Sequence, residues 1–469
     1  MKHITSFICL VMTLLFSSCG EDRTHEYYDL IQRQTWIKSV MDKYYLWYED
    51  IPELTEEDYF KDVNSFFQSL LSKTALDGKG DQYSYLTDLS QPKAEARGLD
   101  HESTYGMEFM LFVDPLQVSS HVFARVLYVA PESPAAQAGI QRGDWLSAID
   151  KEKFNSSNGE KLINGGPISL AREEIISENG ELAWKSVDTV QVAASRHMEV
   201  SPFFINKTFL ADGKKIAYLM YNEFSTGPLD GETETEYNDQ MIQIFQNFKA
   251  QAPDAFILDL RYNLGGYVHC AQLLGSLLAP SSALGKNFFT LRYNDQQETQ
   301  TVDYPLLTSA ANANLNLSKI YILVGIHTAS ASEIIINCLR PYMGEENVIL
   351  IGSPTEGKNV AMDIIKNNEY QFILYPVTSY VENAEGFSDY SKGFTPDYLI
   401  EEYSQLYWGE LGNPNEELLL NSAMRLILTG SLPDASTPQP EPQKALFNSL
   451  DMRSLKGNLT KEHIEQTNF

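Results

Sequence analysis

The sequence predicts a multidomain α+β protein with three folded parts. Its length of 469 residues, at about 150 residues per domain, indicates roughly three domains. The hydrophobic periodicity is helical near the N-terminus, then β-rich, and finally alternates between strands and helices. A hydrophobic content of 43% is enough to build several cores.

The first 18 residues have the pattern of an export signal. Lys2 supplies a positive charge, and the apolar run from Ile4 to Phe16 is too short for a comfortable membrane span. Ser17 and Ser18 are small residues directly before Cys19. The segment resembles a bacterial lipoprotein signal, so we expect lipidation of Cys19 and attachment to a membrane of the cell envelope. An ordinary signal peptide, in which Cys19 has no role, is the alternative.

Residues 24–98 are expected to form a helical N-terminal domain. Trp36, Val40, Tyr44 and Trp47 repeat at helical spacing, and a second apolar stripe lies between Phe60 and Leu71. Such stripes predict packing against a core.

Residues 99–196 predict a β-rich module that contains one short helix. The stretch Val122–Ala130 is rich in β-formers. Ser133 suits a helix N-cap, Pro134 the first helical position and Gly139 the end of the helix. A second strand is expected over Trp145–Ile149.

Residues 197–432 predict an α/β core with a mostly parallel sheet. Apolar strands alternate with helices, which is typical of a sheet covered on both faces. The expected strands are Ile216–Tyr221, Ala255–Leu260, Ile320–Val324 and Val348–Ile351, and helices are expected near 237–248, 268–278 and 331–340. Residues 433–469 begin with several prolines among polar residues and are expected to form a polar tail.

Composition and motifs exclude several functional classes. A net charge of −28, from 35 basic and 63 acidic residues, argues against nucleic acid as a partner. Cysteine and histidine spacings typical of metal sites are absent from the sequence. The stretch Gly352–Lys358 approaches a nucleotide-binding loop, but Asn359 stands where a Ser or Thr would bind magnesium. We therefore expect no metal and no cofactor.

One candidate for chemistry is the end of the strand that leads into Gly265 and Gly266. Glycines at such a turn let backbone N–H groups face a cavity, as an oxyanion hole requires. A tight strand-to-helix turn that only needs positive φ is the alternative.

A second candidate is Ser330, which follows a predicted buried strand and opens a helix. A serine at such a turn can project its hydroxyl at the carboxyl edge of the sheet. Ser330 and Glu333 also form a capping-box pattern, which needs no catalysis. Lys358 lies one helix and one strand further on, so a right-handed crossover places it at the same edge. A desolvated lysine can act as base for a serine, and a surface lysine is the alternative.

Together these segments resemble the carboxyl-terminal processing (tail-specific) proteases, serine peptidases with a Ser-Lys dyad. The matching pieces occur in family order: Leu258–Gly266, Ser330–Glu333, Gly352–Lys358 and Gly393–Asp397. The resemblance implies that Ser330 is the nucleophile and Lys358 the general base. It also implies an oxyanion hole formed by the N–H of Ala331 and of Gly265 or Gly266.

The module over 99–196 resembles the PDZ domain of these proteases. Its most recognisable stretch runs from Ser133-Pro134-Ala135 to Gly143-Asp144. The residues Gly106, Met107, Glu108 and Phe109 resemble the loop that holds a peptide's terminal carboxylate through backbone N–H groups. A small β-domain that only packs or spaces is the alternative.

The resemblance implies a serine endopeptidase, lipid-anchored in the bacterial cell envelope and facing the periplasm or the surface. Its expected substrates are exported polypeptides, captured by exposed C-termini. Two positions depart from the family pattern, since Met362 stands where many members carry glutamine and Asn359 replaces a glycine. These departures keep open a catalytically inactive PDZ-bearing binding protein. His327 and His269 lie near the site segments, and a structural role is expected for both.

Overall fold

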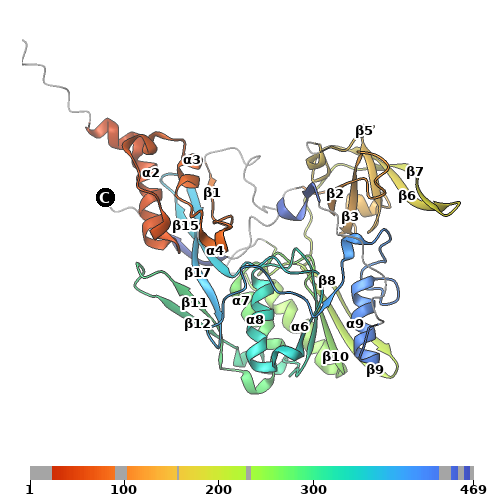
Figure 1. The fold of residues 1–469 in the computed structure, drawn as a ribbon. Coiled ribbons are helices and arrows are strands. Elements are labelled where there is room, and N and C mark those ends of the chain that lie inside the picture. Colours follow the sequence, from red (N-terminus) through yellow and green to blue (C-terminus); the bar gives the residue numbers. More distant parts are fainter. Residues whose placement is uncertain are drawn as a thin grey trace, which may run out of the picture.

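The computed structural model describes residues 24–89, 103–155, 158–228, 234–432, 445–452 and 459–464. The predicted export signal and Cys19 lie outside the described residues, as does most of the Pro-rich stretch. Figure 1 shows the helical N-terminal part and the β-rich module standing apart from each other on the larger α/β body. Among the described residues, no helix is long and apolar enough to cross a membrane.

The N-terminal part is helical and covers a sheet. Its elements are α2 (Thr24–Tyr44), α3 (Val63–Ser69), α4 (Ala75–Gly78) and β1 (Tyr85–Asp88). Trp36 and Val40 of the predicted helical stripe are buried together with Phe66, Phe67 and Leu70 of the second stripe. The two stripes therefore form one core, as their spacing predicts.

The β-rich module is a single sheet with one short helix. Its elements are β2 (Met107–Val113), β3 (Val122–Val129), α5 (Pro134–Gln137), β4 (Trp145–Ile149), β5 (Glu152–Lys153), β6 (Ile168–Glu178) and β7 (Glu181–Val192). Ser133 caps α5, because its hydroxyl accepts the N–H of Ala136 at 3.0 Å. The strand order β2-β3-β4-β6-β7 leaves β2 near one edge.

The α/β body contains a six-stranded sheet in the order β18-β14-β13-β10-β9-β8. Its strands are β8 (Phe203–Ala211), β9 (Lys214–Tyr221), β10 (Ala255–Asp259), β13 (Ile320–Val324), β14 (Val348–Gly352) and β18 (Tyr398–Leu399). Every neighbouring pair is parallel except β8 with β9. The carboxyl ends of β10, β13 and β14 therefore meet at one edge, where the candidate site residues follow.

The expectation of a mostly parallel core is only partly right, because a second, largely antiparallel sheet completes the body. It runs in the order β1-β16-β15-β17-β11-β12. Its further strands are β11 (Asn287–Tyr293), β12 (Thr301–Pro305), β15 (Val360–Asn367), β16 (Phe372–Tyr375) and β17 (Val377–Asn383). The N-terminal helices pack on this sheet, which brings residues 81–85 close to the start of β15.

Period-two alternation along the parallel strands gives the body two cores. Ala217, Leu219 and Tyr221 of β9 face the side covered by α6 (Glu236–Gln251), α7 (Val268–Leu278) and α8 (Ala331–Met343). Tyr218 and Met220 face the other side, which α9 (Leu418–Thr429) covers together with residues of the β-rich module. The module is thus packed onto the body rather than joined only by a linker.

A buried arginine fastens the β-rich module to the body. Arg142 binds Glu402 Oε1 at 2.5 Å, the Tyr262 hydroxyl at 2.6 Å and the Gly409 carbonyl at 3.0 Å. Both partners of the ion pair are almost fully buried. Removing one partner would leave an uncompensated buried charge, so this contact restricts the orientation of the module.

The predicted polar tail returns to the folded body as strands. β19 (Phe447–Asn448) pairs antiparallel with β2, and β20 (Leu459–Ile464) pairs in parallel with β15. Residues 445–452 therefore lie between the β-rich module and the α/β body, contrary to the expectation of a simple tail.

Gly393 packs directly against the segment that leads to Lys358. A Cβ at Gly393 would stand 2.0 Å from the Thr355 carbonyl oxygen, whereas a Cβ at Gly386, with the same φ of +80°, would meet open space. We expect Gly386→Ala to lower the free energy of unfolding by about 1–2 kcal/mol through backbone strain. Gly393→Ala should cost about 1–3 kcal/mol more, because the carbonyl must move. Urea unfolding measures both, and equal losses would contradict this packing.

Candidate active site

Ser330 occupies a strained turn between β13 and α8. Its backbone angles are φ +56° and ψ −110°, and only 3% of the residue is exposed. An N-cap residue normally has extended backbone angles, so capping alone does not require this conformation. Strain of this kind at a strand-to-helix turn is typical of nucleophile elbows. The Ser330 turn thus combines the strain expected of a catalytic serine with a capping-box contact, since Glu333 accepts the N–H of Ser330 at 2.9 Å.

The Glu333 carboxylate joins the turn at Ser330, the predicted nucleophile (the nucleophile turn), to the loop that leads to Lys358 (the lysine loop). Its Oε2 accepts the N–H groups of Ser330, at 2.9 Å, and of Lys358, at 2.5 Å. Its Oε1 accepts the Thr355 hydroxyl at 2.6 Å and the Gly357 N–H at 2.8 Å. Burial raises the pKa of Glu333 to about 7, although its hydrogen bonds favour the charged form. One side chain therefore fixes the backbones of both predicted catalytic residues next to each other.

Lys358 lies in an apolar setting that favours the neutral amine. Burial lowers the pKa of Lys358 to about 8, against the opposing charges of Asp81, Glu356 and Glu333. Its Nζ lies 3.9 Å from Met362 Sδ and 4.7 Å from the centre of the Tyr83 ring. A thioether is only a weak acceptor, so Met362 orients the amine less firmly than a glutamine carbonyl would.

The Gly-Gly turn lies beside the nucleophile turn. The Ala329 N–H donates to the Asn263 carbonyl at 3.1 Å, and the Ser332 hydroxyl donates to the same oxygen at 3.0 Å. Gly266 has φ +140°, and a Cβ there would stand 2.2 Å from the Phe224 carbonyl oxygen. Only glycine fits this close approach.

The predicted oxyanion donors differ in what they bind. The Gly265 N–H donates to Asn263 Oδ1 at 2.8 Å, which takes it away from an oxyanion role in this structure. Ala331 is the first residue of α8, where backbone N–H groups have no partner within the helix. Ala331 is therefore a stronger candidate donor than Gly265.

A buried ion network supports the strand that leads to this turn. Arg261 binds Asp259 Oδ2 at 2.8 Å, Glu402 Oε1 at 2.6 Å and Glu417 Oε1 at 2.6 Å. Glu402 also binds Arg142 of the β-rich module. The network thus connects the module to Arg261, which lies two residues after the end of β10 and two residues before Asn263.

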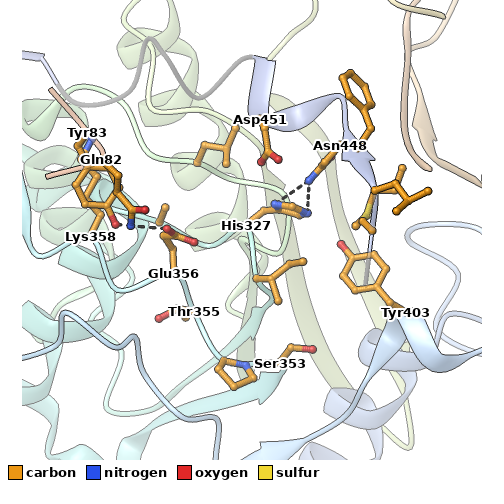
Figure 2. A pocket seen from close by; sticks show the side chains of 18 of the residues that line it. Gln82, Tyr83, His327, Ser353, Thr355, Glu356, Lys358, Tyr403, Asn448 and Asp451 are labelled. Atoms are coloured by element: carbon orange, nitrogen blue, oxygen red, sulfur yellow. Dashed lines mark hydrogen bonds between the residues drawn. The ribbon is translucent and has the colours of Figure 1, made fainter. Parts of the chain in front are cut away.

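The site opens into a cavity of about 860 Å³. Its lining includes Lys358, Ala329 and Glu356, while Ser330, Gly265 and Gly266 are not among the lining residues. Figure 2 shows Lys358 beside Tyr83 at one end of this cavity and His327 with Asn448 at the other. Lining residues come from the N-terminal part, the α/β body and the C-terminal segment, so the cavity forms where these parts meet.

His327 and His269 are neutral near pH 7. Burial lowers the pKa of His327 to about 4, and its Nε2 lies 2.9 Å from Asn448 Nδ2. Burial also lowers the pKa of His269. His327 lines the cavity but is a weak base, which leaves Lys358 as the better candidate. Within the described ranges, no group of three or more His, Cys, Asp or Glu residues is placed to hold a metal ion.

In the predicted carboxylate-binding loop, the backbone N–H groups of Gly106 and Phe109 already have partners within the chain. The Gly106 N–H donates to the Thr104 hydroxyl at 2.9 Å, and the Phe109 N–H donates to the Ser449 hydroxyl at 2.9 Å. Met107 pairs with Val129, and Glu108 is 3% exposed. These residues therefore contact other segments of the same chain at the module edge where a bound peptide was expected.

Comparison with known proteins places this arrangement in a family. The model described as "Peptidase family S41" matches residues 215–400, "Peptidase S41 N-terminal domain" matches 32–85 and "PDZ domain" matches 125–163. A solved structure from Bacteroides fragilis NCTC 9343, assigned to the S41 proteases, is 33% identical. It aligns over 85% of this chain and 98% of its own, with a TM-score of 0.73. The chain belongs to peptidase family S41.

Curated relatives of this S41 chain are named as processing proteases. The carboxyl-terminal-processing protease of Synechocystis sp. is 23% identical over 64% of this chain and 63% of its own length. Carboxyl-terminal-processing peptidase 2, chloroplastic, of Arabidopsis thaliana is 24% identical over 64% of this chain and 55% of its own. The chain thus spans less than two thirds of the length of these relatives.

Sequence reasoning missed several residues of the site. Tyr83 lies under the Lys358 amine, although it is far away in the chain and no local pattern links the two. Thr355 lies within the predicted segment Gly352–Lys358, but its hydrogen bond to Glu333 was not expected. The apolar stretch Ala445-Leu446-Phe447 was the available signal that the tail returns to the body, since it interrupts a polar region.

Glu333 provides a prediction about positioning. Glu333→Gln keeps the shape but replaces one acceptor oxygen with a donor that faces N–H groups, so the two loops separate. A shift of about 1 Å in such a site costs about 100-fold in kcat. We expect that loss with substrate KM changed much less, measured by steady-state cleavage of an unfolded protein. Glu382→Gln, on a half-buried β17 side chain that binds Arg292 away from the site, is the matched control and should retain parental kcat. If Glu333→Gln kept a kcat within roughly threefold of the parent, the positioning role of this carboxylate would be contradicted.

Proposed function

We propose that this S41 protein is a serine endopeptidase that uses Ser330 as nucleophile and Lys358 as general base. The observation that carries the proposal is Glu333, whose Oε2 accepts the backbone N–H of both residues. A structural cap would need only the contact to Ser330. The contact to Lys358 gives the same carboxylate a role in assembling a dyad.

The proposed reaction uses these groups in turn. The neutral Lys358 amine takes the proton of the Ser330 hydroxyl while Oγ bonds to the carbonyl carbon of the peptide bond. The N–H of Ala331, together with that of Gly265 or Gly266, stabilises the oxyanion, with support from the N-terminus of α8. The C–N bond then breaks, and Lys358 gives the proton to the leaving amine. Lys358 then takes a proton from water while the water oxygen bonds to the acyl carbon. The C–Oγ ester bond breaks, and Lys358 returns the proton to Ser330 Oγ.

The proposed substrates are polypeptides of the cell envelope with exposed C-termini. The match to a PDZ domain and the cavity, which Met110 of β2 also lines, support an extended peptide as ligand. The proposed location is the bacterial envelope, with the chain held by lipid on Cys19. This part rests on the sequence pattern of residues 1–19.

A catalytically inactive peptide-binding protein is the second candidate. The observation that favours it is the contact of Lys358 Nζ with the weak acceptor Met362 Sδ. The same contact also keeps the amine in apolar surroundings, which lowers its pKa and supports its use as a base.

Cleavage by variants of the purified protein tests the proposal. We expect the parent to cleave an unfolded protein, and Ser330→Ala and Lys358→Ala each to lower kcat at least about 1000-fold, because each removes an essential group. Lys392→Ala is the matched control, since this lysine is exposed and lies outside the cavity. It should cleave as the parent does.

Parental rates in Ser330→Ala would overturn the proposed nucleophile. An intact parent that binds peptides without cleaving them would support the second candidate.

A further inference from the structure

Residues 445–452 lie along the free edge of β2 as an added strand. The Leu446 N–H donates to the Leu111 carbonyl at 2.8 Å, and the Ser449 N–H donates to the Phe109 carbonyl at 3.0 Å. The pairing is antiparallel, with Phe447 opposite Leu111. The segment therefore runs toward the loop at the start of β2, the direction in which a peptide would be added to this edge.

Side chains of this segment also make specific contacts with the module. The Ser449 hydroxyl donates to Glu108 Oε2 at 2.5 Å and accepts the Phe109 N–H at 2.9 Å. The Phe447 ring stacks on Phe109, with ring centres 5.7 Å apart. Ser449 and Glu108 are both buried, so their hydrogen bond is shielded from water.

The same segment closes one side of the cavity that contains Lys358. Phe447, Asn448 and Asp451 are among the residues that line it. The Asn448 side chain contacts the ring of His327, as Figure 2 shows. His327 precedes Ser330 by three residues in the chain. A peptide that reached Lys358 along β2 would meet this segment first.

We propose that residues 445–451 are an internal peptide ligand that occupies the peptide-binding edge of the PDZ domain and that an incoming polypeptide must displace. The binding part of the proposal depends only on the contacts with β2. Its consequence, a self-restrained protease, rests on the proposed function. The chain continues past Ser449 into a turn at Leu450–Met452, so the internal ligand holds the edge without a terminal carboxylate.

The contacts also define the peptide that fits this edge. The peptide is extended and carries an aromatic residue that stacks on Phe109. A serine two residues later donates to Glu108. An external peptide partner should therefore resemble the internal ligand in sequence.

Peptide binding tests the proposal in the full chain, with Ser330→Ala present in every sample to prevent cleavage. The probe is a fluorescein-labelled synthetic peptide with the sequence of residues 445–452, followed by fluorescence anisotropy. Leu446→Pro with Ser449→Pro removes both backbone donors to β2. We expect this double variant to bind the probe at least about tenfold more tightly than the parent, because a tethered segment competes at high effective concentration.

Three comparisons make this test specific. Ser449→Ala keeps its backbone N–H and should give a smaller gain in affinity. Leu210→Ala, on an exposed side chain of β8, is the control and should bind the probe as the parent does. A probe whose serine is replaced by alanine should bind the double variant about tenfold more weakly. Equal affinity of the probe for the parent and the double variant, or no binding to the double variant, would overturn the proposal.

Activity distinguishes this inference from the proposed function. With Ser330 intact, the double variant should cleave an unfolded protein several-fold faster than the parent. If the probe affinities change as expected but neither protein cleaves, the internal ligand stands and the proposed protease fails. If the parent cleaves but the probe affinities are equal, the protease stands and the internal ligand fails.

Discussion

The buried carboxylate of Glu333 is the contact on which the site depends. Its two oxygens accept four hydrogen bonds, from the nucleophile turn and from the loop that carries Lys358. Burying a carboxylate is costly unless it is fully hydrogen-bonded, so this geometry is strongly specified. The strained backbone of Ser330 persists because these bonds and the packed start of α8 hold it from both sides.

The rest of the molecule brings separate surfaces to this carboxylate. The parallel sheet delivers Ser330 at the end of β13, the antiparallel sheet delivers Lys358 at the start of β15, and the N-terminal part places Tyr83 against the lysine amine. The PDZ domain is fastened by Arg142, whose partner Glu402 also binds Arg261 below the Gly-Gly turn. A change at the PDZ domain thus has a direct physical route to the turn that contains Gly266.

Patterns that depend on neighbouring residues were predictable from the sequence, and contacts between distant segments were not. The strand at Ile320–Val324, the helix after Ser330 and the cap at Ser133 follow from local periodicity and capping, and all three are confirmed. The antiparallel sheet was missed in part because β15 is buried along nearly its whole length and shows no alternation. Gly265 was predicted as a possible oxyanion donor, but its N–H donates to the Asn263 side chain within the same turn. The pairing of Phe447 with β2 joins residues more than 300 positions apart, and no local pattern encodes it.

The central claim is that a neutral Lys358 activates Ser330, and the pH dependence of Ser330 phosphonylation tests it most directly. The protein would be incubated with a fluorophosphonate, and mass spectrometry of the peptide that contains Ser330 would give the rate. The fraction of neutral lysine grows as pH rises through its pKa of about 8. The rate should therefore increase about tenfold per pH unit below 8 and level off above it, and Lys358→Ala should abolish this midpoint. Labelling of a different serine, or the same pH profile in Lys358→Ala, would contradict the claim.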